Sequence, residues 1–547
     1  MAERRDPRLS RRSFIRAAVT AASSAAGAAL LQACSAGDVA TNSPAPTKAA
    51  GATTGAVPSA AGAASPAAGG SPTATVLGAA STLAAAQPTS TFVPATVAAP
   101  AVKKNFNGAT IKIAASTEYY AYALRQFRDQ IEKEGNLKLN IDVVPGTDLF
   151  QRNITEYTTQ STSYDVTMFL PFQLPDYAAH LEPIKPLMDK NGFDLKLDDI
   201  LPVFRNVYTT WGGTMLAVSF DGDMHMMYYN RDAFENTDLV KQYKDKTGKA
   251  LAPPATWDDY AALAQFFTET PWRKDNQKGY GTAEGLGGPN WWWQNRLGAY
   301  GGVYFDDALT PLINSKNALL ATDNLVKVAA FMPPGSNSFG YQETENALAK
   351  GDVALSVNWS STGRVVTDPK KSAVIGKIGF AVTPGAVVNG QTLVHPALAT
   401  GWSLGIPKYG KQKDAASYVV WFYSQPEVHL HFCLDPNTGI DAYRSSVLVN
   451  DQFISLYSKP YVDTIKQSLP VGFPDLQIPG ASAYYTPLND ALTQAITKVK
   501  PTADALNTAA DAWNKISDRV GKQKQTDAWK QAYTAMKTQG LEYKPIT

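Results

Sequence analysis

The sequence of 547 residues contains only two cysteines, Cys34 and Cys433. Two cysteines so far apart do not form the disulfide framework of a small secreted domain, and Cys433 is most simply a buried apolar thiol. A strong excess of charge is also lacking, because 50 Lys and Arg stand against 48 Asp and Glu. Part of the small basic excess lies in an arginine-rich N-terminus, so the remaining chain gives no reason to expect a nucleic acid partner.

Motifs that mark metal and phosphate sites are lacking as well. No His-Glu-x-x-His zinc helix is present, and the glycine-rich stretch 281–288 has no lysine and serine of a phosphate-binding loop. His429, His431 and Cys433 have no further ligand at the spacing of a defined metal site. Acidic pairs such as Asp258 and Asp259 are typical of helix starts. We therefore expect a protein that is not an enzyme and needs no metal or cofactor.

The N-terminus has the layout of a signal peptide. Its arginines, Arg4, Arg5, Arg8, Arg11, Arg12 and Arg16, precede an uncharged stretch from Ala17 to Ala33. This stretch is shorter than the roughly 20 strongly apolar residues of a membrane-spanning helix, so we expect it to be cleaved. The segment Ser10–Arg16 closely resembles the twin-arginine export signal. Leu31–Cys34 resembles a lipobox, which predicts a signal peptide at 1–33 and a lipidated Cys34 that anchors the chain to the outer face of the cytoplasmic membrane.

Residues 34–104 have the composition of a tether. From Ser35 to Val102 the chain is mostly Ala, Thr, Ser, Pro and Gly, and its only charges are Asp38 and Lys48. Such a segment cannot bury enough apolar surface to offset the entropy lost on ordering, which predicts a disordered linker. A glycosylated stalk fits this composition equally well.

The remaining residues, from about 105 to 547, are too many for one compact core and predict two lobes. Short apolar runs bounded by turns predict strands at 110–113, 139–143, 165–170, 215–220, 353–357, 378–382 and 402–406. Residues 122–134 carry apolar side chains at helical spacing, and Thr256 is placed to cap a helix. Alternating strands and helices predict an α/β protein whose lobes each contain a mostly parallel sheet flanked by helices.

Several ordered segments carry a resemblance to a known family. They are Ala217–Asp223, Tyr228–Asp232, Pro254–Asp258, Gly301–Asp306, Ala349–Leu355, Asn358–Trp359, Gly401–Pro407 and Tyr484–Tyr485. Together they resemble the family 1 extracellular solute-binding proteins of ABC importers, which have the maltose-binding-protein fold. The resemblance implies a multi-segment hinge between lobe 1, residues 105–222 and 396–432, and lobe 2, residues 223–395 and 433–547.

The same resemblance implies a set of ligand-binding residues in the cleft between the lobes. They are Glu118, Tyr119, Phe169, Phe172, Asp223, Trp359, Trp402, Tyr484, Tyr485 and Arg444. A carboxylate such as Asp223 can accept hydrogen bonds from adjacent hydroxyls, and aromatic rings offer flat faces to a sugar. Each of these residues has a simpler alternative role in core packing or turn capping. Of the consecutive Trp291, Trp292 and Trp293, at most one or two can face a cleft.

The function implied by the resemblance is that of a monomeric carrier. It would bind a sugar or oligosaccharide by hinge closure and deliver it to ABC permease subunits in the membrane. A carrier for an oligopeptide or a polyamine remains an alternative, although Glu118 and Asp223 alone give few carboxylates for a polyamine. A secreted glycoside hydrolase is the alternative outside the carrier class.

Overall fold

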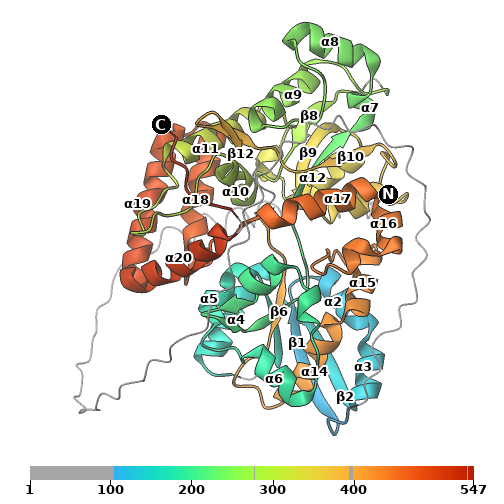
Figure 1. Ribbon diagram of the computed structural model, residues 1–547, viewed down its shortest axis with the longest axis vertical. Coiled ribbons are helices and arrows are strands. Elements are labelled where there is room, and N and C mark those ends of the chain that lie inside the picture. The colour runs from blue at the N-terminus through green and yellow to red at the C-terminus, as the bar shows by residue number, and fades with distance from the viewer. Residues whose placement is uncertain (1–103, 162, 276, 394–397, 539, 547) are drawn as a thin grey trace, which may run out of the picture. The chain divides into compact units, whose positions relative to one another are not determined.

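The computed structural model describes residues 104–547 except 162, 276, 394–397, 539 and 547 (Figure 1). The predicted signal peptide (1–33), the lipidated Cys34 and all of the predicted tether except Lys104 lie outside the described residues. Within the described part of the chain, no helix combines the length and the apolar character needed to cross a membrane.

The first sheet contains five strands in the order β2-β1-β3-β14-β6. These are β2 (Leu137–Val143), β1 (Ala109–Ala115), β3 (Val166–Phe169), β14 (Ser403–Gly405) and β6 (Ala217–Ser219). Strand β1 runs parallel to β2 and β3, whereas β14 runs antiparallel to both β3 and β6. A strand from the second half of the sequence therefore completes a sheet that the first half begins.

The second sheet contains four strands in the order β10-β7-β9-β8. These are β10 (Ile378–Ala381), β7 (His225–Asn230), β9 (Val353–Trp359) and β8 (Tyr280–Ala283). Only β8 and β9 are parallel, because β7 runs antiparallel to β9 and β10. The predicted α/β class is confirmed, but both sheets are mixed. β7 and β14 each follow a segment that crosses from the other sheet. Each of these strands therefore enters its own sheet from the end opposite to that at which its neighbours enter.

Helices flank both sheets (Figure 1). Around the first sheet they are α2 (Glu118–Gln126), α3 (Arg128–Gly135), α4 (Gly146–Thr158), α5 (Leu174–Tyr177), α6 (Ile184–Asn191), α14 (Lys413–Ser424) and α15 (Pro426–Leu434). The second sheet packs with α7 (Arg231–Phe234), α8 (Thr237–Thr247), α9 (Trp257–Glu269), α10 (Asn290–Ala299), α11 (Lys316–Ala329), α12 (Tyr341–Ala349), α13 (Thr362–Thr367), α16 (Asp451–Tyr457), α17 (Lys459–Ser468), α18 (Ala481–Ile496), α19 (Thr502–Val520) and α20 (Lys522–Lys537).

Short elements complete the described chain. The strands outside the two main sheets have two or three residues each; they are β4 (Thr210–Trp211), β5 (Thr214–Met215), β11 (Ala386–Val388), β12 (Gln391–Leu393), β13 (Leu398–Ala399) and β15 (Phe473–Pro474). Short 3-10 turns lie at 171–173, 197–199, 336–338, 447–449 and 469–471, and a single π-helical turn spans 203–207.

The second sheet is buried on both faces, as its sequence suggests. Met226 and Tyr228 of β7 pack in one apolar cluster with α12, α16 and α17, whereas the intervening Met227 packs in another with α9, α10 and α18. This alternation follows from the two-residue period of a strand. Every residue of β9 is buried, which explains its almost continuous apolar sequence.

Two helix predictions have different outcomes. The predicted start at Thr256 is confirmed, because the Thr256 hydroxyl accepts a hydrogen bond from the Asp259 backbone N–H at 3.1 Å and so caps α9. The single helix predicted at 122–134 is instead two helices, α2 and α3. They meet at Phe127, whose backbone leaves the helical region (φ −104°, ψ 9°) while its ring packs against Phe422 and Phe432.

Three segments link the two sheets and are hydrogen-bonded to one another. The first, after β6, contains Asp221 and Gly222; the second runs from β13 to β14; the third follows α15. The Gly222 N–H donates to the Asp441 carbonyl at 3.2 Å, and the Thr400 N–H donates to the Asp223 carbonyl at 2.9 Å. We call these three segments the crossing segments. The lobe boundaries 105–222 with 396–432, and 223–395 with 433–547, stay a prediction.

Candidate functional site

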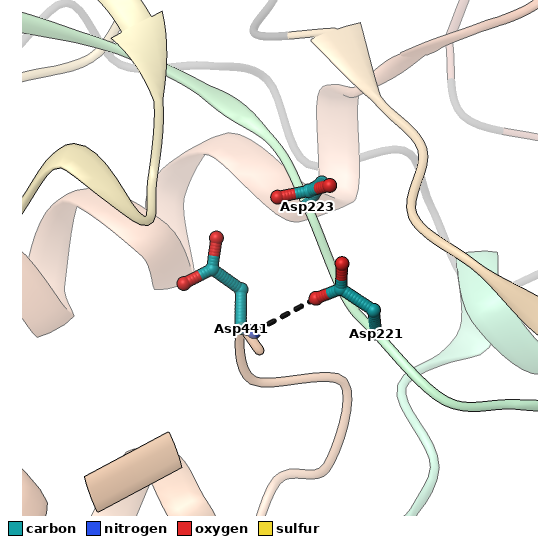
Figure 2. A group of neighbouring side chains, drawn as sticks. All are labelled: Asp221, Asp223 and Asp441. Carbon is teal, nitrogen blue, oxygen red and sulfur yellow. Dashed lines mark hydrogen bonds between the residues drawn. The ribbon is translucent and has the colours of Figure 1, made fainter. Parts of the chain in front are cut away.

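Three carboxylates meet where the crossing segments contact each other (Figure 2). Asp221 and Asp223 lie on the first crossing segment and Asp441 lies on the third. One oxygen from each side chain lies within 4.8 Å of the others. Asp221 and Asp441 are buried, whereas Asp223 keeps partial exposure to solvent. We call Asp221, Asp223 and Asp441 the carboxylate cluster.

Hydrogen bonds from the surrounding elements fix two members of this cluster. The Tyr120 hydroxyl, on α2, donates to the Asp221 Oδ2 at 2.7 Å, and the Asp441 backbone N–H donates to the Asp221 Oδ1 at 2.8 Å. The Ser360 hydroxyl, directly after β9, donates to the Asp441 Oδ2 at 2.6 Å. Groups from both sheets therefore hold the cluster, and Asp223 is the member left with surface for a further partner.

The pKa values of all three carboxyls are raised. Burial, followed by the neighbouring charge of Asp441, raises the pKa of Asp221 to about 7. Burial and the charges of Asp221 and Asp441 raise the pKa of Asp223 well above its ordinary value. Burial also raises the pKa of Asp441, although the hydrogen bond from Ser360 opposes this. The physical cause is that desolvated carboxylates this close together cannot all ionise cheaply.

The cluster favours partners that donate hydrogen bonds or carry positive charge. An ionised carboxylate only accepts hydrogen bonds, and its two oxygens can serve two adjacent hydroxyls or an ammonium group. A hard cation such as calcium prefers six to eight oxygen ligands, more than these three side chains supply alone. An anionic ligand would be repelled. The chemistry of the site is therefore binding of a neutral or cationic group rich in donors.

An aromatic group lies beside the carboxylate cluster at the end of β9. The ring centroid of Trp359 is 4.0 Å from that of His225 and 5.8 Å from that of Trp291. Trp359 is 9% exposed and Trp291 is partly buried. Trp292 and Trp293 are buried, and their indole N–H groups donate within the core, to the Val357 carbonyl and the Thr322 hydroxyl. Of the three consecutive tryptophans, Trp291 is the one with remaining surface.

A fourth carboxylate supports this aromatic group. Asp475, just after β15, accepts hydrogen bonds from the Thr400 hydroxyl at 2.8 Å, the Trp291 indole N–H at 3.2 Å and the Tyr485 hydroxyl at 3.4 Å. Burial raises the pKa of Asp475 to about 6. The Tyr485 ring also packs edge-on against Phe172, with centroids 5.3 Å apart. This contact joins the segment after β3 to α18.

Six of the ten predicted site residues lie near these two groups. Asp223 belongs to the carboxylate cluster, Trp359 to the aromatic group, and Phe172 and Tyr485 pack beside Asp475. Tyr119 directly precedes Tyr120, whose ring lies 5.6 Å from that of Trp402. The structure therefore brings Tyr119, Phe172, Asp223, Trp359, Trp402 and Tyr485 toward one region.

The other four predicted residues are placed elsewhere. Phe169, Tyr484 and Arg444 are fully buried, so a ligand could reach them only after a rearrangement of the core. Arg444 pairs with Asp199 at 3.3 Å and also donates to the backbone carbonyls of Leu195, Lys196 and Ser424, which together compensate its buried charge. Glu118 points to solvent and pairs with Arg125 at 2.9 Å.

The sequence also contains one pattern that is typical of a hydrolase active site, and the structure shows where its serine lies. Residues 401–405, Gly-Trp-Ser-Leu-Gly, have the Gly-x-Ser-x-Gly spacing of a hydrolase nucleophile elbow. That motif requires a sharp strand-to-helix turn that exposes the serine. Here Ser403 lies within β14, paired with Phe169 and Ser219, and is 1% exposed. The pattern is therefore part of a buried strand and does not form an elbow.

Several residues of the candidate site were not predicted from the sequence. Asp221 could have been found as the partner of Asp223 in Asp-Gly-Asp, and Tyr120 as the neighbour of Tyr119. Asp441 and Asp475 had no local signal, because they reach the site only through pairing of distant segments. Asp441 lies on the third crossing segment, and Asp475 directly follows β15.

The comparisons with known proteins agree with this fold. The chain belongs to the bacterial extracellular solute-binding protein family, whose model matches residues 113–428. It is 26% identical over 413 residues to a mannitol-binding protein of Pseudomonas aeruginosa, covering 71% of this chain and 88% of that protein. It is also 26% identical over 333 residues to a probable amino-acid ABC transporter periplasmic-binding protein of Sinorhizobium fredii, covering 60% and 72%.

A solved structure extends the likeness in fold. An ABC transporter solute-binding protein of Agrobacterium radiobacter, in complex with ribitol, matches with a TM-score of 0.64 at 20% sequence identity. The match covers 76% of this chain and all of the other. At this identity the likeness concerns the fold alone.

Proposed function

We propose that this protein is the substrate-binding component of an ABC importer and that it binds a neutral polyhydroxylated solute, a sugar or a sugar alcohol. The observation that carries the proposal is the carboxylate cluster at the crossing segments, with Trp359 beside it. Hydroxyl groups can donate to Asp223 and its neighbours, while indole and phenol faces pack against C–H groups. The relatives named for mannitol and solved with ribitol support this class of solute.

Binding at the crossing segments also suggests how the carrier works. A solute that contacts groups from both sheets is held best when the two approach, so it shifts the population toward the closed state. Permease subunits that prefer the closed state would then distinguish loaded from empty carrier. In this proposal the solute is released unchanged, and the protein acts as a monomer without catalysis.

A cationic solute is the second candidate. The sequence suggested too few carboxylates for a polyamine, but Asp221 and Asp441 beside Asp223 now supply three. The relative named as a probable amino-acid transporter component also fits a solute with an ammonium group. Oligopeptides and polyamines therefore belong in any ligand screen.

The predicted N-terminal features complete the proposal. We infer export through the twin-arginine signal at 1–33, lipidation at Cys34 and a tether at 34–104 that holds the carrier at the outer face of the cytoplasmic membrane. Two acyl chains anchor a protein stably, where a single one does so only marginally. Labelling with a radioactive fatty acid should mark the wild-type protein and leave Cys34→Ser unmarked.

The solute class can be tested by isothermal titration and thermal shift. We would use the full chain with Cys34→Ser and titrate D-mannitol, ribitol and maltose, with spermidine and a tripeptide as the competing class. A solute at about 100 times its Kd should stabilise the protein by about 2.7 kcal/mol. Chromatography of the recovered solute would show whether it is unchanged.

Variants locate the binding at the cluster. Asp223→Asn should weaken sugar or polyol binding about tenfold or more, because it replaces one acceptor oxygen with an N–H donor. Asp307→Asn, at an exposed position, is the matched control and should bind normally. If spermidine is the only probe that binds, the proposed solute class is wrong and a cationic solute takes its place. Hydrolysis of maltose would contradict the carrier role.

A further inference from the structure

One buried arginine lies beside the third crossing segment with only uncharged hydrogen-bond acceptors. Arg364, on α13, is 4% exposed, and within the described residues its guanidinium donates to backbone carbonyls and hydroxyls alone. Two other buried arginines each have a carboxylate partner, because Arg296 pairs with Glu284 and Arg444 with Asp199. A buried charge without a paired carboxylate costs folding free energy, so Arg364 needs a counter-charge nearby.

The guanidinium of Arg364 closes one loop of the third crossing segment. Its acceptors in this loop are the carbonyls of Cys433, Asp435 and Ile440 and the hydroxyl of Thr438. The Nη2 atom donates to the first of these carbonyls at 2.8 Å and to the last at 3.3 Å. Ile440 directly precedes Asp441, so the planar guanidinium fixes the backbone that leads into the carboxylate cluster.

Tyr457, on α16, orients this guanidinium. Its hydroxyl accepts hydrogen bonds from the Nε of Arg364, at 2.7 Å, and from the Nη2. The same hydroxyl donates to the Cys433 carbonyl at 3.2 Å. Arg364 is therefore held in one orientation by a residue that binds the same loop, and its charge has a fixed position.

The segment that carries Arg364 also holds the side chain of Asp441. Ser360, four residues earlier, donates its hydroxyl to the Asp441 Oδ2 at 2.6 Å. The Ser360 carbonyl in turn accepts hydrogen bonds from the hydroxyls of Tyr461 at 2.9 Å and Tyr228 at 3.3 Å. This one segment therefore fixes Asp441 twice, through its carboxylate and through the backbone that precedes it.

Arg364 is the one cation among the ionisable groups that face Asp441 in the described chain. These groups are Asp221 and Asp223 on the first crossing segment, Tyr228 on β7, Glu345 on α12, Arg364 on α13, Cys433 on α15, Tyr457 on α16 and Tyr461 on α17. Burial raises the pKa values of the tyrosines and of the thiol, so these groups stay neutral near pH 7. The charge of Arg364 opposes the rise in the pKa of Asp441 that burial causes.

We infer that Arg364 is a positioning residue for the carboxylate cluster: it fixes the loop that leads into Asp441 and supplies a positive charge beside that carboxylate. This inference rests on the proposed function, in which the hydroxyls of the solute donate to the cluster. With Arg364 in place, Asp441 is the member that stays ionised at neutral pH. The protons of the cluster then lie on Asp221 and Asp223.

The test separates the charge of Arg364 from its hydrogen bonds. In the full chain with Cys34→Ser, D-mannitol and maltose are titrated from about pH 4 to about pH 8 into wild type, Arg364→Gln and Arg364→Lys. Arg364→Gln should reach half of its maximal affinity about one pH unit higher than wild type, because a nearby positive charge lowers a carboxyl pKa by about 1–3. Arg364→Lys keeps the charge and should keep the wild-type midpoint. A wild-type midpoint in Arg364→Gln, or an equal shift in Arg364→Lys, overturns the inference.

Arg444→Gln is the matched control. Arg444 is also buried and also donates to three backbone carbonyls, but its carboxylate partner is Asp199, outside the carboxylate cluster. This variant should unfold at a lower urea concentration than wild type and still bind within about twofold, with an unchanged pH midpoint. The same midpoint shift in Arg444→Gln would mean that the effect comes from any buried arginine and would overturn the role of Arg364.

A second measurement needs no solute. If the wild type binds neither probe, the proposed solute class fails, and urea unfolding of wild type, Arg364→Gln, Asp441→Asn and the double variant decides the inference. At pH 8 the two changes should be coupled by at least about tenfold in the unfolding equilibrium constant, and at pH 4 most of this coupling should be lost. Additive effects at both pH values overturn the inference. If Arg364→Gln alone does not fold, Asp441→Asn should restore its folding, and a double variant that also fails to fold overturns the inference.

Discussion

At the scale of single residues, the carboxylate cluster lowers the stability of the folded protein while it supplies the acceptors that the proposed function uses. Asp221, Asp223 and Asp441 lose most of their contact with water and lie within reach of each other's charge. Such an arrangement costs folding free energy at neutral pH, because the charged forms are poorly solvated and repel each other. Sites that bind a ligand often keep groups of this kind, since activity and stability have different requirements.

The cost should appear as a pH dependence of stability. In the folded chain Asp221 keeps its proton up to about pH 7, whereas its ordinary pKa is 3.8. The folded state therefore binds more protons than the unfolded state between about pH 4 and pH 7, so stability falls as the pH rises through this window. Asp223→Asn removes part of this effect.

We expect Asp223→Asn to stabilise the ligand-free protein by about 1–2 kcal/mol at pH 8 and by less at pH 4. Thermal unfolding at both pH values, followed by circular dichroism, measures the difference. Asp307→Asn, whose side chain is exposed, should show no such pH-dependent gain. Equal gains at both pH values would show that repulsion between carboxylates is not the cause.

Sequence reasoning reached some site residues and missed others for identifiable reasons. Asp223 and Trp359 stand in segments that resemble the family, so their position along the chain was enough to predict a ligand-binding role, which stays a prediction. Tyr484 and Tyr485 could not be separated in the same way, because adjacent helical residues point in directions about 100° apart. The structure buries Tyr484 against Trp513 and turns Tyr485 toward Asp475.

At the scale of elements, close packing of backbone at the crossing segments requires glycine. Gly401 has φ +131°, and a Cβ there would lie 2.1 Å from the Asp221 carbonyl oxygen. Gly222 has equally little space around it, because a Cβ added at this position would lie 2.7 Å from the carbonyl carbon of Ala442. Side chains at these positions would push apart the segments that form the carboxylate cluster.

Gly401→Ala should therefore destabilise the protein by about 2–4 kcal/mol and weaken solute binding, through backbone strain and a clash with the first crossing segment. Urea unfolding measures the first effect and isothermal titration the second. Gly288→Ala is the control, because no atom lies within 4 Å of its added Cβ. It should change stability by less than about 0.5 kcal/mol. A stable Gly401→Ala protein would mean that the crossing segments can separate without penalty.

Most strands of the two main sheets were predicted, but β7 and β8 were not, and the order of the strands could not be predicted. The runs at 110–113, 139–143, 353–357 and 378–382 alternate or cluster apolar residues, and all correspond to observed strands. The insertion of β14 between β3 and β6 depends on contacts more than 180 residues apart along the chain, which no local pattern encodes. The same limit explains the mixed sheets and the unpredicted Asp441.

At the scale of the whole molecule, three crossing segments connect two sheets that each have helices on their flanks. A small change of backbone angles in three short segments can therefore move one sheet with its helices as a body relative to the other. The solute supplies the energy for this movement only through contacts that it makes better in the closed state. In the proposed function, the hydrogen bonds from the solute to the carboxylate cluster are contacts of this kind.

We expect the radius of gyration from small-angle X-ray scattering to decrease when the wild type is saturated with its solute. Asp223→Asn at the same solute concentration should show little decrease, because it binds weakly. Solute binding by calorimetry without any change in scattering would contradict closure. The same samples would reveal a dimer, against the proposed monomer, from the scattering at zero angle.

If the solute binds at the carboxylate cluster, as proposed, the raised pKa values there mean that it meets bound protons. Near pH 6 to 7 the empty protein holds a proton on Asp221 for much of the time, because its pKa is raised to about 7. Hydroxyl donors favour the ionised carboxylates and so displace those protons into the buffer. Loading is therefore an exchange of one occupant for another, and its apparent enthalpy depends on which buffer accepts the protons. Acid surroundings would compete with the solute, and the carrier would hold its load more tightly as the medium becomes alkaline.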